Sequence, residues 1–200
     1  MTGFRGPRVA VVLSLALAAL AGLQLAVWGS GEEGIRVLVR SSARSSVLLF
    51  SLAFTASSAR VLWQNGVTKW LLANRRYLGL SYAASHAIHL LALIALYPAS
   101  DDFRTSLNAV TLVGGGIAYA FTAAMAATSN DASVAALGRR RWTLLHTVGG
   151  WFIWFVFAQS YLPRAFLYPA YLPAAGVVLA VPALRGARRM RRRATQAQAA

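Results

Sequence analysis

Cysteine is absent from this 200-residue chain, and acidic residues are scarce: five Asp and Glu stand against twenty Lys and Arg. Without cysteine the chain can form no disulfide, no thiolate-ligated cluster and no covalently attached c-type haem. Any haem here would be a non-covalent b-type, held by side chains alone. Charged residues make up only 12% of the chain and hydrophobic residues 58%, which is typical of an integral membrane protein.

The apolar residues fall into runs of about twenty, the length that crosses a hydrocarbon core of ~30 Å. We therefore predict an all-α, polytopic membrane protein, a bundle of six transmembrane helices. The predicted spans are Val9 to Trp28, Ser46 to Trp63, Tyr77 to Tyr97, Leu107 to Ala127, Trp142 to Leu162 and Leu167 to Leu184.

These spans divide the chain into an N-terminus (1–8), a transmembrane domain (9–184) and a basic tail (185–200). No connection between them approaches the ~50 residues of a small domain. Flavin or nicotinamide chemistry would therefore have to come from another protein.

The formal net charge is +15, and its distribution suits a bilayer better than a nucleic acid. Arginines cluster between spans two and three, before span five and after span six. The opposite connections hold mixed charges: Glu32 and Glu33 against Arg36, Arg40 and Arg44, Asp101 and Asp102 against Arg104, then Arg164. The positive-inside rule predicts that both termini are cytoplasmic, in a bacterial inner membrane. The arginine-rich stretch 188–193 is expected to anchor this topology; binding of anionic lipid or of an acidic partner is the alternative.

The three histidines, His86, His89 and His146, all lie inside predicted spans, and no other ionisable residue lies as deep. Ionisable groups in a membrane are costly and usually have a partner in the bundle interior. For imidazole that partner can be a metal, in helical bundles usually haem iron. The structural alternative is a histidine hydrogen-bonded to a neighbouring helix.

His86 and His89 are three residues apart and point toward one face of a helix. Spans three and five run in the same direction, so their histidines can meet across one gap. Counted at ~1.5 Å per residue from the basic ends, His89 lies ~18 Å deep, His86 ~14 Å and His146 ~6 Å. On this count His86 matches His146 better than His89 does.

Two stretches resemble the signature stretches of the ferric reductase-like transmembrane domain family, and most closely those of the MsrQ-type haem-binding membrane subunits. The first opens span three and runs to His89; the second opens span five and runs to His146. Their matching residues are Arg75, Arg76, Leu78, Gly79, Leu80, Leu90 and His89, then Thr128, Ser129, Asn130, Leu137, Gly138, Arg140, Arg141, Trp142, Leu145 and His146.

The resemblance implies a haem b-binding electron-transfer subunit, an oxidoreductase component without a flavin or nicotinamide domain of its own. It implies iron ligation by His89 and His146, electrons from a soluble cytoplasmic flavin or nicotinamide reductase, and an extracytoplasmic acceptor protein or ferric chelate. Arg75, Arg76 and Arg139 to Arg141 would pair with haem propionates or dock the reductase, although anchoring at the interface also explains them.

One family position departs from the pattern. The family usually has another histidine thirteen residues after His146, where this chain has Gln159. Because glutamine is a poor iron ligand, the number of haems, one or two, stays open, and His86 either ligates or supports a ligand. The alternatives are a non-redox scaffold or small-molecule carrier, and a cytochrome b that reacts with quinone; binding of FMN is a further option.

Overall fold

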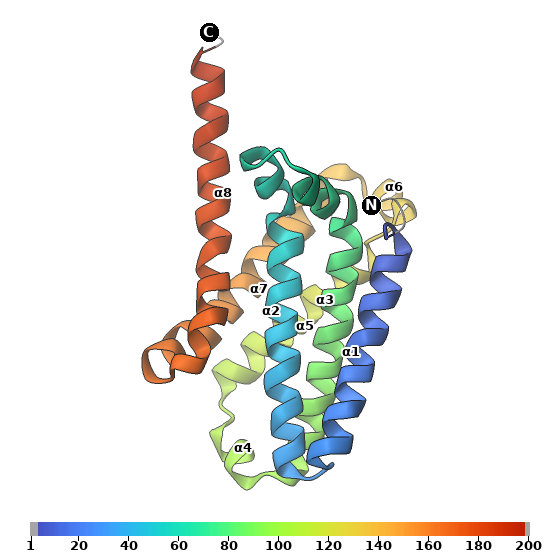
Figure 1. Ribbon diagram of the computed structural model, residues 1–200, viewed down its shortest axis with the longest axis vertical. Helices are drawn as coiled ribbons and strands as arrows, with labels where there is room; N and C mark the ends of the chain where they lie inside the picture. Colours follow the sequence, from blue (N-terminus) through green and yellow to red (C-terminus); the bar gives the residue numbers. More distant parts are fainter. Residues whose placement is uncertain (1–3, 199–200) are drawn as a thin grey trace.

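The computed structural model describes residues 4–198 and is built from helices (Figure 1). Residues 1–3 of the predicted N-terminus and 199–200 of the predicted tail lie outside the described part. The helices in chain order are α1 (Pro7–Trp28), α2 (Glu32–Leu62), α3 (Gly66–Ala99), α4 (Asp101–Ser106), α5 (Ala109–Ala127), α6 (Asp131–Leu137), α7 (Arg139–Leu167), the 3-10 turn η1 (Pro169–Tyr171) and α8 (Leu172–Gln198).

Five helical segments are long and apolar enough to cross a membrane: α1, α2, α3, α5 and the stretch of η1 with α8. This confirms an all-α, multi-pass membrane protein. The fifth predicted span, Trp142 to Leu162, corresponds to α7, which is long enough to cross a membrane but is less apolar than these five segments. Three tryptophans and two glycines lie in α7, and these residues contribute little to mean hydropathy even where they suit a membrane helix.

Helices α1, α2 and α3 stand side by side, while α5 and α7 cross behind them (Figure 1). Phe50 of α2, Tyr82 of α3 and Phe157 of α7 meet at the centre, with ring centroids 5.5 to 6.3 Å apart. All three side chains are buried. Aromatic packing therefore joins the upright layer to the crossing layer.

Helices α2 and α3 begin earlier than predicted, at Glu32 and Gly66 instead of Ser46 and Tyr77. Glu32 and Glu33 occupy the first turn of α2, where negative charge favours the helix dipole. The charged residues taken for a loop are helical, because arginine is a good helix former and these side chains can project outward.

The early start of α2 corrects the prediction that the histidines are the only ionisable residues deep in long apolar helices. Ser41 bonds Gln24 near the end of α1 at 2.8 Å, and the next residue, Ser42, lies 3.1 Å from His89 Nδ1, so this part of α2 is level with His89. Arg40 and Arg44 flank Ser41 on α2 and are exposed on the outside of the bundle. Their stems can lie along lipid while their guanidinium groups reach toward the head groups.

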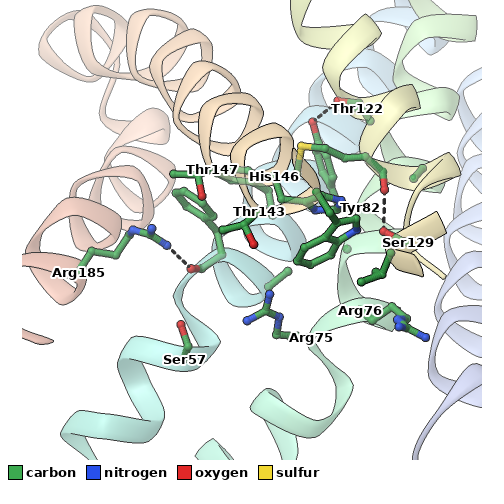
Figure 2. A pocket seen from close by; sticks show the side chains of 18 of the residues that line it. Ser57, Arg75, Arg76, Tyr82, Thr122, Ser129, Thr143, His146, Thr147 and Arg185 are labelled. Carbon is green, nitrogen blue, oxygen red and sulfur yellow. Dashed lines mark hydrogen bonds between the residues drawn. The ribbon is translucent and has the colours of Figure 1, made fainter. Parts of the chain in front are cut away.

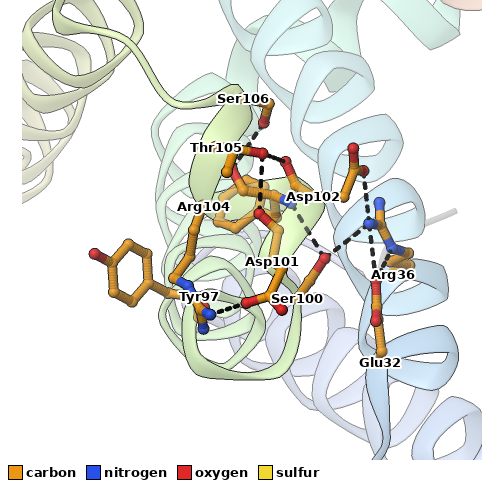
Figure 3. A network of polar contacts seen from close by, with 10 residues as sticks. Glu32, Arg36, Tyr97, Ser100, Asp101, Asp102, Arg104, Thr105 and Ser106 are labelled. Carbon is orange, nitrogen blue, oxygen red and sulfur yellow. Dashed lines mark hydrogen bonds and ion pairs between the residues drawn. The ribbon is translucent and has the colours of Figure 1, made fainter.

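At the same end of the bundle, Arg36 ties α2 to the short helix α4. It donates to Glu32 at 2.9 Å, to Ser100 Oγ at 2.9 Å and to Asp102 at 3.0 Å (Figure 3). We call this the acidic end, and the opposite end, where the arginines of α3, α7 and α8 gather, the basic end. Helix α8 runs on through the predicted tail and projects past the bundle at the basic end (Figure 1).

Candidate functional site

A cavity of about 600 Å³ opens toward the basic end, between α2 and α3 on one side and α5, α7 and α8 on the other. This volume lies within the roughly 300–1,000 Å³ typical of small-molecule and cofactor sites. Phe50, Phe54, Tyr82, Met125 and Trp142 form apolar walls. Arginines stand at its rim, so we call it the arginine-rimmed cavity (Figure 2).

Both stretches that carry the family resemblance contribute to this cavity. Arg75, Arg76 and Gly79 line it from α3, Ser129 lines it from the connection after α5, and Trp142 and His146 line it from α7. Arg76 forms an ion pair with Asp131 of α6, which joins the first stretch to the second. This hydrogen bond and the charge of Arg76 hold the pKa of the Asp131 carboxyl below its ordinary value.

His146 is held in place by the connection between α5 and α7. Gly138, the residue that precedes α7, has a φ of 75°, which glycine adopts more readily than other residues. The turn brings Trp142 Nε1 to 2.9 Å from the carbonyl oxygen of Thr128. The Trp142 and His146 rings then stack with centroids 4.1 Å apart, and His146 Nε2 lies 3.2 Å from Thr128 Oγ1.

The rim includes two arginines of α8, Arg185 and Arg188, and the second belongs to the stretch 188–193 that was expected to anchor the topology. Arg185 donates to the carbonyl oxygen of Phe54 at 3.0 Å, and its guanidinium lies 4.0 Å from the centroid of the Phe54 ring. Arg188 donates to Ser57 Oγ at 2.8 Å. Their spacing of three residues on a helix that continues from a span was the sequence signal that both could face the bundle.

Arg139, Arg140 and Arg141 do not line the cavity and are exposed. They occupy the first turn of α7, and the cavity lining in this helix begins at the next residue, Trp142. Of the predicted partners for haem propionates, Arg75 and Arg76 are therefore in position and these three are not.

His86 and His89 lie deeper and do not line the cavity. Their ring centroids are 5.6 Å apart, and the His86 ring stacks on Tyr119 of α5 at 4.4 Å. His86 Nδ1 and the Tyr119 hydroxyl are buried and have no hydrogen-bond partner among the described residues. Gln159, the position where the family has a histidine, is exposed on α7.

His89 belongs to a polar contact surface between α2 and α3 that we call the serine seam. Its Nδ1 lies 3.1 Å from Ser42 Oγ. Ser85 Oγ lies 2.9 Å from Ser45 Oγ and 3.0 Å from Ser46 Oγ, and it donates to the carbonyl oxygen of Ser42. Imidazole and hydroxyl groups here satisfy one another across the two helices.

The structure places His89 and His146 at different levels of the bundle. Tyr82 bonds Thr122 at 2.9 Å, which sets a common level for α3 and α5. His89 lies seven residues from Tyr82 toward the acidic end, and Thr128, the partner of His146, lies six residues from Thr122 toward the basic end. At ~1.5 Å per residue, these two helical segments separate the levels of His89 and Thr128 by up to roughly 20 Å.

Among the described residues no group of three or more histidine and acidic side chains is placed to hold a metal ion. Comparison with known proteins adds no assignment: no family model, no curated protein and no solved structure matches this chain. The site is therefore interpreted from its own geometry.

Proposed function

We propose that this protein is a haem b-binding electron-transfer subunit of a bacterial inner membrane, with six membrane-spanning helices and both termini cytoplasmic. The observation that most directly supports this proposal is that His146 lines a cavity of cofactor size with aromatic walls and an arginine rim. In this proposal α7 also spans the membrane, as the fifth of six spans in chain order. Its 29 residues are long enough to cross a bilayer, and its core residues Ile153 and Phe157 are buried among the other helices.

The residues around the cavity suit a b-type haem. His146 supplies one imidazole, Phe54 and Trp142 supply flat apolar surfaces, and Arg75, Arg76 and Arg185 supply charge for carboxylates. When bound, the haem would supply reversible one-electron exchange at its iron. No second histidine lines the cavity among residues 4–198.

Because His89 lies at another level, we propose that His146 alone of the three histidines binds iron in this cavity. The pairing of His89 with His146 stays a prediction from the resemblance. His86 and His89 are candidates for a second haem, with the unpartnered His86 Nδ1 as the available nitrogen.

The proposed donor is a soluble cytoplasmic flavin or nicotinamide reductase, because the cavity opens at the basic end and residues 4–198 form no domain of that kind. The proposed acceptor is an extracytoplasmic protein or ferric chelate. Reduction of the purified protein by quinol alone would instead assign a quinone-reactive cytochrome b.

The test is the reduced-minus-oxidised absorption spectrum of the protein purified in detergent from haem-replete cells. For a single haem held by His146, we expect a haem b spectrum that His146→Ala abolishes and that His86→Ala and His89→Ala retain. A second haem at His86 and His89 would leave a haem b spectrum in the His146→Ala protein. Equal loss with His89→Ala and His146→Ala would overturn the single-ligand assignment in favour of one iron shared by both. Colourless wild-type protein would overturn electron transfer.

One observation favours a second candidate, a carrier of amphipathic anions without redox function. The cavity joins an apolar body to a cationic rim, and that combination needs no iron. Colourless protein that copurifies with an amphipathic anion is the result expected of this candidate.

A further inference from the structure

The positive charge at the rim of the arginine-rimmed cavity is not balanced by nearby carboxylates. Arg75, Arg185 and Arg188 line the cavity, and none of them forms an ion pair within residues 4–198. The nearby acid, Asp131, is engaged by Arg76. The residues that line the cavity include no aspartate or glutamate.

The partners that these arginines do have are neutral. Arg185 bonds a backbone carbonyl and lies against Phe54 and Trp151, and Arg188 bonds the Ser57 hydroxyl. Both side chains are partly buried. A carbonyl or hydroxyl partner satisfies one donor of a guanidinium but leaves its charge and its remaining donors available.

Hydroxyl groups surround the same rim. Ser57, Thr143 and Thr147 line the cavity beside the arginines, as Figure 2 shows for Arg75 and Arg185. Guanidinium groups joined by hydroxyl donors are a common recognition set for planar or tetrahedral oxyanions. The walls beyond the rim are aromatic, so the group that carries the anion is expected to be apolar.

We propose that Arg75, Arg185 and Arg188 form an oxyanion site that binds the carboxylate or phosphate of an amphipathic ligand whose apolar body occupies the cavity. If the carboxylates are haem propionates, this inference rests on the proposed function and names the residues that bind them. It also stands without that function, because the phosphate of an anionic phospholipid has the same chemistry.

The probes are protoporphyrin IX and its dimethyl ester, which differ in their carboxylates and contain no iron. Binding to the full-length protein in detergent is followed by porphyrin fluorescence. We expect the free acid to bind at least roughly tenfold more tightly than the ester, the size of effect given by a charge-assisted hydrogen bond. Competition by phosphatidic acid but not by phosphatidylcholine would identify lipid phosphate as a second source of the anion.

Arg75→Gln, Arg185→Gln and Arg188→Gln should each reduce the preference for the free acid. Arg191→Gln is the matched control, because Arg191 also holds α8 against α2, through the carbonyls of Val61 and Leu62, but does not line the cavity. It should leave the preference unchanged, and so should exposed Arg140→Gln.

Equal affinity for acid and ester, binding of neither porphyrin nor phosphatidic acid, or the same loss in Arg191→Gln would overturn the oxyanion site. Failure of the proposed function gives a different result. A chain purified without haem that still prefers the free acid would reject the haem and retain the site.

Discussion

The serine seam and the arginine-rimmed cavity are both polar regions inside one helical bundle, but the polar groups of the seam bond one another, whereas the arginines of the cavity have no counterion. In the seam, Ser46 and Ser85 are fully buried and bond each other at 3.0 Å. At the cavity, Arg185 and Arg188 bond neutral groups and keep their charge. Polar groups that satisfy one another hold helices together, whereas charge without a counterion is suited to binding a ligand.

A close contact of α7 with α2 fixes one wall of the cavity, and its disruption should have the largest effect on stability. A Cβ atom added at Gly150 would lie 2.5 Å from Cε2 of Phe54. That ring cannot move freely, because it packs on Phe50 and Trp151. Gly150→Val should lower the free energy of unfolding by about 1–3 kcal/mol, as overpacking does.

Thermal unfolding in detergent measures this change. Gly176→Ala is the matched control, since a Cβ there meets no atom within 4 Å. It should be neutral or slightly stabilising because alanine favours a helix more than glycine does. A Gly150→Val protein as stable as the control would show that the cavity wall is not fixed by this contact.

A smaller effect is expected from the serine seam. Ser85→Ala removes the partner of Ser45 and Ser46, and should cost about 1 kcal/mol. Ser46→Ala combined with Ser85→Ala should cost less than the sum of the two single changes, because the second change then removes a bond already lost. Strictly additive unfolding free energies would show that the two hydroxyls do not support each other; exposed Ser106→Ala is the control.

The smallest effect on stability is expected from the ion pair of Asp131 with Arg76, which holds α6 beside the cavity. Since folding lowers the pKa of Asp131, its contribution is present above the ordinary carboxyl pKa and is lost as the pH falls through the lower, folded value. The protection of the α6 amides, measured as their exchange rate relative to the intrinsic rate at each pH, should therefore fall at acidic pH in the wild type. Asp131→Asn should show the faster exchange already at neutral pH, and an unchanged exchange rate would contradict a role for this pair.

How far the sequence predicts this protein differs from element to element. Apolar runs located α1 and α5 to within two residues of their observed ends, because few charges interrupt them. The starts of α2 and α3 were missed, because helices continue past charged residues that face outward. Both family-like stretches line the cavity, but of their two histidines, which were expected to face each other across one gap, only His146 lines it. Arg185 and Arg188 could not be assigned to the same site from their spacing alone.

The sequence by itself determined that the chain is helical and membrane-embedded and that its histidines lie within long helices, because composition and run length are local properties. Only the tertiary structure decided which of those residues share a site. The axial offset of one helix against another depends on contacts such as Gly150 with Phe54 and Tyr82 with Thr122. Those contacts bring His146 to the arginines of α8 and leave His89 in the serine seam.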